Sequence, residues 1–571
     1  MNKTVKTIIA SCMMMPMLAG CLEETFPTDS MTQEQVENSG SSLEPLSIAL
    51  PKRMMTLGYE YSSIGYAGIM LALDVAAGES PVASTSWDYP RWYANDTYLG
   101  ESGQTVIDWW MLYTEVIHCA NLVLKAAPNS SEATNGQLML MGNALAYRAM
   151  ANLDMVRLYE YKHTGYASLD NQAEEAGIYN LTVPMITEKT TEVESRTNAR
   201  SPFYAMYRYI MDDLNQAEVY MNGYNSPAYN MADAAVVYGL KARLWLEMGT
   251  RFEKYPDDLQ TMINHENDDA LADFDRLGVT TAKECFDNAA TYARLAIGEG
   301  GEPLTEAEWY DTTTGFNTAN HAWLWAIQID KDDVPSSLWA YLSFIGMMAP
   351  EAEFGVACAS KGSARMITKS LYDTIEDGDW RKKTWIAPED EGKESMASKY
   401  ATSLMAYEWA QHAAYTGFKF RPGQGDMDGY MTGVAVDIPL MRVEEMYLIE
   451  AEALGHSQGV TAGVKALKSF LDTYRYSDGA TYSCSATTID ELTDEVLRQK
   501  RIELWGEGIV AYDYKRLEKA VIKDYDGTNH PEAYRSNTLT GYVAPRLNIC
   551  FPISETLYNS ALVNNPDPAT K

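Results

Sequence analysis

Apolar residues recur at spacings of three and four along most of the chain, which is the period of amphipathic α-helices. In the segment 103–127, this spacing joins Trp110, Tyr113, Ile117 and Leu124. The same pattern predicts further helices over the segments 44–55, 136–161, 202–221, 232–248, 281–297, 440–454 and 461–474. We therefore predict a mainly α-helical protein.

Most of the predicted helices follow one another in pairs, and an amphipathic helix needs a neighbour to bury its apolar face. Such pairs resemble tetratricopeptide-type units, although the strict repeat motif is absent from the sequence. We expect the pairs to pack side by side and to form a superhelical scaffold.

The helical pattern is interrupted between about residues 300 and 435. Within this region, the segments 323–329 and 417–421 are typical of short strands, and the loops around them are rich in Gly, Ser and Asp. We predict a loop-rich insertion that contains short strands. Aromatic residues also gather there, namely Trp309, Tyr310, Trp339, Tyr341 and Phe344.

The chain has 571 residues, which is more than a single core usually holds. No linker rich in Pro or Ser and no break in composition divides it. We therefore predict one domain over residues 43–571. Its helical scaffold covers about 43–300 and 436–571, and its insertion covers about 300–435.

The stretch 497–517 combines a helix, a glycine break and a second, short helix. Val496 and Leu504 belong to an apolar stripe on the first helix, so this face is predicted to pack inward. Gly506 and Gly508 then end the helix, because glycine is a common helix terminator and permits a close approach of the backbone.

The first residues have the features of a secretory signal. Lys3 and Lys6 precede an apolar run over residues 8–18, which is too short to span a bilayer. Residues 18–21 read Leu-Ala-Gly-Cys, the lipobox pattern in which Cys21 becomes the first mature residue and carries a lipid. The alternative is an ordinary signal peptide followed by an incidental cysteine.

Cleavage would remove residues 1–20 as a signal peptide and leave the polar segment 21–42 as a lipidated, extended tether. The mature chain keeps 43 basic and 79 acidic residues, a net charge of −36. This charge argues against nucleic acid or anionic lipid as a partner, because both require clusters of Lys and Arg. No later segment is apolar for long enough to cross a membrane, so we predict an anchored protein.

The cysteines that remain after Cys21 are scattered and form no CxxC pair, so neither a zinc site nor a disulfide-stabilised small domain is predicted. Most are expected to be small core residues, while one or two disulfides stay open for an exported protein. Asp426 and Asp428 resemble half of a calcium loop, but the closing Glu is absent and a turn is predicted instead. We expect no metal and no cofactor.

Several segments in order along the chain resemble one protein family. Residues 147–159 read YRAMANLDMVRLY, residues 438–453 read IPLMRVEEMYLIEAEA, and residues 551–566 read FPISETLYNSALVNNP. In the stretch 497–517, Arg-Ile-Glu-Leu is followed by Gly-Glu-Gly and then by an Asp and a basic residue. With the lipobox, these segments span nearly the entire chain and resemble the SusD/RagB family of outer-membrane glycan-binding lipoproteins.

The resemblance implies a lipoprotein on the exterior of the outer membrane that acts as the lid of a SusC-like TonB-dependent transporter. The two proteins would capture oligosaccharide or polysaccharide and pass it inward. Glu23 and Glu24 lie soon after Cys21 and resemble the acidic export tag of such lipoproteins. The RagB branch of the family implies an alternative, the capture of oligopeptides by the same architecture. A peptide site would need groups that read chain termini or backbone edges.

The long loop over residues 78–100 carries the main candidate binding residues. Sugar rings have apolar C–H faces and a rim of hydroxyls, so a glycan site needs flat aromatic side chains with hydrogen-bonding groups around them. Trp87, Trp92 and Tyr93 are predicted to stack on sugar rings. The other candidates are Asp88, Tyr89, Arg91, Asn95 and Asp96 in this loop, and Trp339 and Tyr341, with Ser336 and Ser337, in the insertion.

Other tryptophans and several charged residues are predicted to be structural. Trp323 and Trp325 alternate along a predicted strand. Trp110, Trp245 and Trp505 lie on predicted helices. The charged residues expected to form ion pairs between helices are Arg148, Arg157, Arg442, Glu450, Arg501 and Asp513.

The sequence carries no catalytic motif. GxSxG, HExxH and P-loop patterns are absent, and the seven histidines are dispersed. A glycosidase can be built from two carboxylates, but no motif selects a pair among the 79 acidic residues. We therefore predict a binding protein that is not an enzyme. A structural surface protein without a small ligand is a further alternative, and it predicts that both aromatic loops are buried or disordered.

Overall fold

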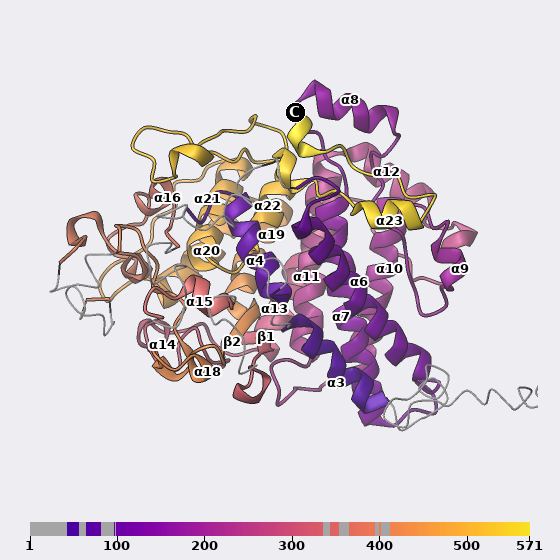
Figure 1. Ribbon diagram of the computed structural model, residues 1–571, viewed down its shortest axis with the longest axis horizontal. Coiled ribbons are helices and arrows are strands. Elements are labelled where there is room, and N and C mark those ends of the chain that lie inside the picture. Colours follow the sequence, from indigo (N-terminus) through magenta and orange to yellow (C-terminus); the bar gives the residue numbers. More distant parts are fainter. Residues whose placement is uncertain are drawn as a thin grey trace, which may run out of the picture.

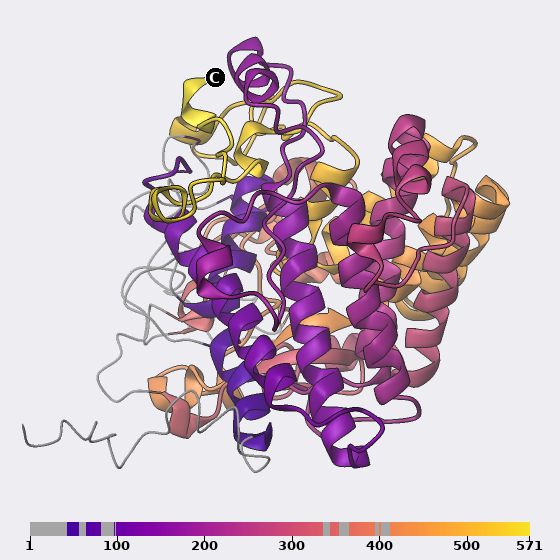
Figure 2. The ribbon, with the colours of Figure 1, turned by 90° about the vertical axis from the view of Figure 1, so that its right-hand side faces the viewer.

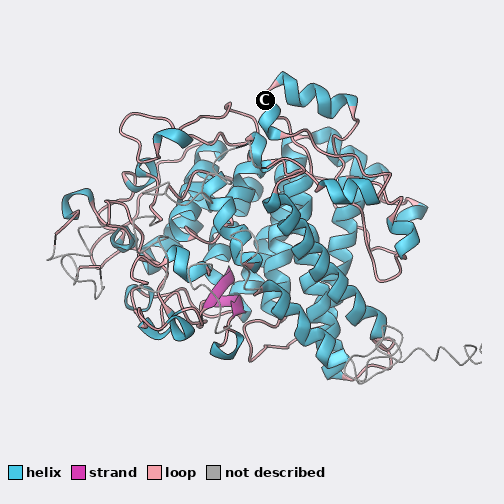
Figure 3. Cartoon of the chain, viewed as in Figure 1, coloured by secondary structure: helices cyan, strands magenta, loops and turns pink. Residues whose placement is uncertain are grey.

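The computed structural model describes residues 43–55, 64–81, 96, 99–334, 343–352, 365–393, 399–400 and 412–571. Long helices fill the centre of the molecule, and shorter helices and loops lie around them (Figure 1). Among the described residues the strands form one small two-stranded sheet (Figure 3). The predicted mainly α-helical fold is confirmed.

The long helices of the first half pack against one another nearly in chain order (Figure 2). α3 packs on α6 and α7, α7 on α10, and α10 on α11. Their bounds are Leu43–Met54 for α3, Gln104–Ala126 for α6, Asn135–Tyr159 for α7, Phe203–Tyr220 for α10 and Ala234–Lys254 for α11. The predicted helix pairs 103–127 with 136–161 and 202–221 with 232–248 are therefore confirmed.

The long helices of the second half continue this arrangement. α13 lies between α11 and α19, and α19 also packs on α20 and α21. Their bounds are Ala282–Glu299 for α13, Val443–Gln458 for α19, Val460–Tyr474 for α20 and Ile489–Glu503 for α21. Each amphipathic face is thus buried by a neighbouring helix, as the pattern of apolar positions predicted.

Threonine residues set the start of several of these helices. The Thr134 hydroxyl accepts a hydrogen bond from the backbone N–H of Gln137 at the start of α7, while the Gln137 side chain accepts one from the Thr134 N–H. Thr281 begins α13 and Thr488 begins α21 in the same way, each with a Glu three residues later. These capping boxes satisfy N–H groups that have no partner within the helix.

Several described helices were missing from the prediction, and α4 and α12 are two of them. α4 (Gly65–Ala76) is buried along its whole length, so its sequence has no polar face to give a helical period. α12 (Pro256–Asn264) lies in the acidic segment 256–275, for which the apolar pattern predicted no helix. Pro256 lies in its first turn. Backbone N–H groups in the first turn make no hydrogen bond within the helix, so proline, which lacks this group, is tolerated there.

The two-stranded sheet corrects the predicted strands. β1 (Trp323–Gln328) agrees with the predicted strand, but its antiparallel partner is β2 (Asp437–Arg442) and not the segment 417–421. That segment makes only isolated bridges. The helix expected from residue 440 begins at Val443, because Pro439 restricts the preceding residue to extended backbone and β2 pairs with β1.

Short elements complete the described chain. The short α-helices are α8 (Ala167–Glu175), α9 (Glu192–Ser195), α14 (Glu306–Trp309), α15 (Phe344–Met348), α16 (Lys369–Tyr372), α18 (Tyr430–Gly433), α22 (Val510–Arg516) and α23 (Ile553–Tyr558). The 3-10 turns are η2 (Asp269–Leu271), η3 (Lys331–Asp333), η6 (Trp380–Thr384), η7 (Pro388–Asp390), η9 (Gly423–Gly425), η10 (Glu532–Tyr534), η11 (Pro545–Leu547) and η12 (Pro568–Thr570).

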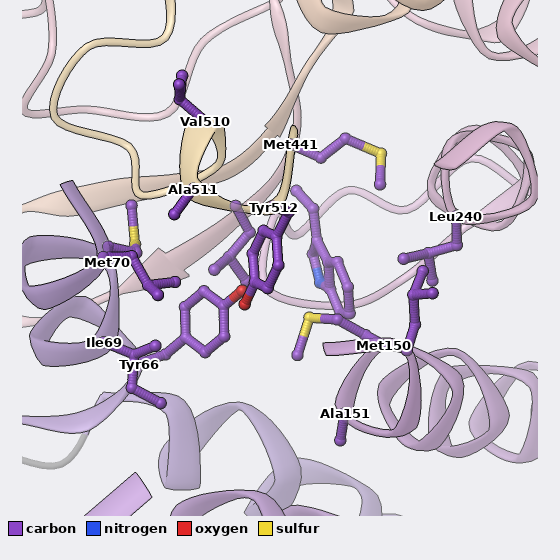
Figure 4. Packing of buried hydrophobic residues seen from close by; sticks show 14 of the residues in the cluster. Tyr66, Ile69, Met70, Met150, Ala151, Leu240, Met441, Val510, Ala511 and Tyr512 are labelled. Carbon is purple, nitrogen blue, oxygen red and sulfur yellow. The ribbon is translucent and has the colours of Figure 1, made fainter. Parts of the chain in front are cut away.

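The main core lies where elements from distant parts of the chain meet (Figure 4). Tyr66 and Met70 of α4 face Tyr512 of α22, and Met150 of α7 lies close by. The Tyr66 hydroxyl donates to Asp154 at 2.7 Å, which satisfies this buried polar group. The short helix α22 thus joins the two halves of the scaffold.

The residues predicted to be structural are in the core. Trp323, Trp325, Trp110, Trp245 and Trp505 are all buried. The six charged residues all form ion pairs, which are Arg148–Asp213, Arg157–Asp154, Arg442–Glu503, Glu450–Arg294, Arg501–Glu79 and Asp513 with Lys500 and Arg516. Not all of them join two helices as predicted, because Arg157–Asp154 lies within α7, Arg442 belongs to β2 and Glu79 lies in no helix.

Four cysteines lie among the described residues, and all four are free thiols. Cys119, Cys285 and Cys550 are buried, as expected of small core residues, while Cys484 is half-buried. Asp426 accepts a hydrogen bond from the Gly429 N–H at 2.8 Å, which confirms the predicted turn. No helix within the described part of the chain has both the length and the apolar character needed to cross a bilayer.

Candidate functional site

The predicted binding residues fall into two groups with respect to the structure. Asp96 lies among the described residues. The others lie outside them, and these are Cys21, Trp87, Asp88, Tyr89, Arg91, Trp92, Tyr93, Asn95, Trp339 and Tyr341, with Ser336 and Ser337. The geometry of the site is therefore built from the residues that flank these segments.

Glu79 holds the chain just before the aromatic segment 82–95. Its carboxylate accepts hydrogen bonds from Arg501 Nε and from the Tyr514 hydroxyl, both at 2.8 Å. The Trp505 indole N–H donates to the Glu79 carbonyl at 3.2 Å. All three partners belong to the stretch 497–517, so that stretch fixes the start of the predicted binding loop.

Asp96 holds the chain just after the same segment. It is buried, and its Oδ1 lies 2.9 Å from Arg546 Nε while its other oxygen accepts from Lys571 Nζ. Both carboxylate oxygens of Asp96 therefore face cations of the protein. Ion pairs at Glu79 and at Asp96 thus set the two ends of the aromatic loop.

The described residues beside the other undescribed segments gather at the same place. The Met366 N–H donates to the Pro81 carbonyl at 3.0 Å, and the Ile367 N–H donates to the Tyr415 carbonyl at 3.0 Å. α15, which follows the segment 335–342, packs on α4. We call the residues 79–81, 343–352, 365–367, 399–400 and 412–421 the platform.

Arg421 ties two further parts of the platform together. Its Nη1 pairs with Glu351 at 2.5 Å, and its Nη2 donates to the Tyr400 carbonyl at 3.0 Å. Arg421 is itself buried. Since a buried guanidinium needs its hydrogen bonds, removal of either contact would be costly, and Arg421 therefore holds these parts of the platform together.

Buried charges connect the platform to the helical scaffold. Lys419 Nζ donates to the carbonyls of Glu503 and Trp505 at 2.9 and 2.8 Å and to the Glu507 carboxylate at 2.5 Å. Burial lowers the pKa of Lys419 to about 8, and the adjacent charge of Glu507 opposes that shift. Arg442 of β2 binds the same Glu507 at 2.9 Å.

Two glycines allow this close packing. Gly506 has φ +82° and Gly508 has φ +70°, the left-handed region that favours glycine. A Cβ atom at Gly508 would lie 2.4 Å from the Cα of Met70 on α4. The predicted glycine break at these two residues is confirmed, and it lets α4 lie directly against the turn before α22.

The carboxylates beneath the platform do not form an accessible acid–base pair. Burial raises the pKa of Asp74 well above its usual range, and the charge of Glu79 adds to this rise. Such a shift can mark a catalytic residue. However, Asp74 is 2% exposed and Glu79 is 1% exposed, so neither can reach a substrate. The described residues contain no cluster of side chains able to hold a metal ion.

The sequence did not indicate the partners of Arg501 and Asp96. Arg501 was predicted to form an ion pair, but Glu79 lies 422 positions away in the chain. Asp96 was predicted to bind ligand, and its contacts with Arg546 and Lys571 come from the far end of the chain. No local spacing could have given either pairing.

Comparisons with known proteins agree with the fold. Residues 357–566 match the SusD family. The fold is similar to that of a SusD-like carbohydrate binding protein from Bacteroides vulgatus, with a TM-score of 0.65 and 20% identity over 92% of this chain and 97% of that one. The chain has a SusD-like fold. A search of curated proteins gives no match.

Other solved structures share the SusD-like fold. A putative sugar binding protein from Bacteroides vulgatus has a TM-score of 0.63 and 20% identity, over 93% of this chain and 98% of that one. A laminarin binding SusD-like protein has a TM-score of 0.60 and 16% identity, over 93% of this chain and 99% of that one.

The family match covers only part of the segments on which the resemblance was based. Residues 438–453, 497–517 and 551–566 lie within the matched region, whereas residues 147–159 and the lipobox lie before it. The solved structures that share the fold include proteins named as carbohydrate, sugar or laminarin binding proteins.

Proposed function

We propose that this protein binds oligosaccharide or polysaccharide at the cell surface without catalysis and delivers it to a SusC-like TonB-dependent transporter, whose lid it forms. The observation that carries the proposal is the anchoring of the aromatic loop. Glu79 and Asp96 fix its two ends by ion pairs, so the candidate residues between them would be presented on a rigid base. Carbohydrate binding by SusD-like neighbours of the same fold supports it.

We assign the binding residues from the sequence and from the anchors at Glu79 and Asp96. Trp87, Trp92 and Tyr93 would stack on sugar rings, because their flat apolar faces match the C–H faces of a pyranose. Asp88, Tyr89, Arg91 and Asn95 would bind hydroxyls, and Trp339 and Tyr341 would contribute from the second segment. Because both oxygens of Asp96 face cations, we assign that residue to positioning the loop.

The proposed location follows from the N-terminal sequence. Cys21 would carry the lipid after removal of residues 1–20, and residues 21–42 would tether a single domain over residues 43–571 to the outer membrane, facing the exterior. The strongly negative chain is suited to remain soluble at the surface. The SusC-like partner rests on the family resemblance.

Loss of either loop tryptophan is expected to weaken glycan binding. The mature protein is tested against plant, host and fungal polysaccharides by affinity electrophoresis and calorimetry, with Trp87→Ala and Trp92→Ala as variants. Removal of one stacking platform costs about 1–3 kcal/mol, which weakens binding roughly tenfold or more. Tyr558→Ala on α23 is a matched control, since that aromatic residue is 44% exposed and is not one of the candidate binding residues.

The control variant should bind like the wild type, and all variants should keep the helical circular dichroism of the parent. If no polysaccharide binds while oligopeptides do, the glycan proposal is wrong and the RagB-type function replaces it. If a polysaccharide binds equally well to the wild type and both tryptophan variants, the assignment of the loop is wrong.

A further inference from the structure

A hollow of about 460 Å³ opens on the described surface between α16, α21 and the segment 519–522. This volume lies within the usual range of small-molecule sites. None of its lining residues belongs to the predicted aromatic loops, although Arg501 and Tyr514 of the lining also hold Glu79 before the segment 82–95.

The lining of the hollow is basic, although the chain as a whole is strongly acidic. Arg498, Arg501 and Lys519 line it together with one carboxylate, that of Asp494. Lys519 pairs with Asp494, and Arg498 donates to Glu495 and to the Thr374 carbonyl. Lys519 and Arg498 are therefore already engaged by groups of the protein. Arg501 is the third cation of the lining.

Arg501 directs an unused pair of donors to the hollow. Its Nε binds Glu79 at 2.8 Å, and its side chain is 21% exposed. Its Nη1 and Nη2 atoms donate to no residue within the described part of the chain. The Tyr514 ring lies 5.9 Å from the guanidinium carbon, and the contact with Glu79 fixes the other edge. A guanidinium held in this way presents a planar fork that matches a carboxylate.

The rest of the lining suits a sugar ring. Ser370 and Thr374 offer hydroxyls, while Leu371, Leu497 and Ile522 offer apolar surface. Hydroxyl groups around an apolar surface match the rim and face of a pyranose. We propose that the hollow binds an acidic sugar residue of the uronate class, with its carboxylate on Arg501. This inference goes beyond the proposed function, because it names a second site and a charged ligand.

The test is calorimetry with the mature protein, an oligogalacturonate and the methyl ester of the same oligomer, in which each carboxylate is replaced by an uncharged methyl ester. The oligogalacturonate is expected to bind at least tenfold more tightly than the ester. Arg501→Lys keeps a cation beside Glu79 but loses the planar fork, and it should weaken binding of the acid about tenfold. Ala520→Trp should block the hollow without contact to Glu79.

Arg196→Lys is the control, because Arg196 is an exposed arginine of an ion pair next to α9. It should bind the oligogalacturonate like the wild type. Trp87→Ala should also bind it like the wild type, and this result would show that the hollow binds the acid without the aromatic loop. Equal binding of acid and ester, or wild-type binding by both Arg501→Lys and Ala520→Trp, overturns the inference. Loss of binding in Trp87→Ala, or tighter binding of acetate or of a peptide carboxylate than of the oligomer, overturns it as well.

Discussion

Replacement of Arg442 by methionine is expected to destabilise the protein by about 3–5 kcal/mol, the usual effect of removing one member of a buried ion-pair network. Arg442 is fully buried and contacts the carboxylates of Glu444 at 2.8 Å, Glu503 at 3.2 Å and Glu507 at 2.9 Å. Its Nη2 also donates to the Glu503 carbonyl at 2.8 Å.

The size of this effect follows from the balance of charges in the network. Its cations are Arg381, Lys419, Arg442 and Arg475, and its anions are Asp379, Glu444, Glu503 and Glu507. The four positive charges balance the four negative charges, so loss of Arg442 leaves one carboxylate buried without a counter-charge. Methionine preserves much of the side-chain volume, which isolates the electrostatic cause from a packing defect.

Urea unfolding followed by circular dichroism measures the change for Arg442→Met. Arg53→Met is the matched control, because Arg53 pairs with Glu115 at 3.3 Å on the surface, with side chains 49% and 46% exposed. Exposed pairs contribute about 0–1 kcal/mol, so the control should unfold nearly like the wild type. A loss of less than about 1 kcal/mol in Arg442→Met would show that the network does not support the platform.

The second large effect is expected at Glu160, which ends α7, and it depends on pH. Burial alone would raise the pKa of this carboxyl, but the charge of Arg251 outweighs burial and lowers the pKa to about 2. Arg251 Nη1 contacts the two carboxylate oxygens at 2.7 and 2.9 Å. The pKa of Glu160 is lower in the folded protein than in the unfolded chain. At pH values between these two pKa values, the unfolded chain therefore binds more protons than the folded protein.

Glu160 therefore stabilises the protein fully above pH 4.5, and this contribution is lost as the pH falls towards 2. The shift corresponds to about 3 kcal/mol. Glu160→Gln should be markedly destabilised at pH 7, and the difference from the wild type should shrink as the pH falls to 3. Unfolding in urea at both pH values measures this change.

Glu192→Gln is the control for this experiment, because Glu192 is exposed and pairs with Arg196 at 2.6 Å within one helical turn. Its stability should follow that of the wild type within about 0.5 kcal/mol at either pH. A constant difference between Glu160→Gln and the wild type from pH 7 to pH 3 would contradict the assigned pKa.

The helical scaffold could be predicted because its apolar period is local. The stretch 497–517 shows this well, since Val496 and Leu504 are buried and Gly506 and Gly508 adopt positive φ, as the sequence indicated. The fully buried α4 escaped prediction because a helix covered on every side has no polar face. β2 escaped because its extended form depends on pairing with β1, more than a hundred residues earlier.

The candidate site could be predicted only in part. The density of aromatic residues around Trp87 and Trp92 is visible in the sequence, and a Pro- and Gly-bounded loop is a common place for binding residues. The anchors at Glu79 and Asp96 could not be predicted, because their cations come from the far end of the chain. Long-range ion pairs leave no periodic signal in a single sequence.

The most direct test of the central claim is a crystal structure of the mature protein with an oligosaccharide from the polysaccharide that it binds. We predict a sugar ring stacked on the indole of Trp87 or Trp92, with carbon atoms within about 4.5 Å of the ring. Glu79 and Asp96 should keep their ion pairs in that complex. An oligosaccharide bound away from the residues 82–95, with neither indole in contact, would contradict the account.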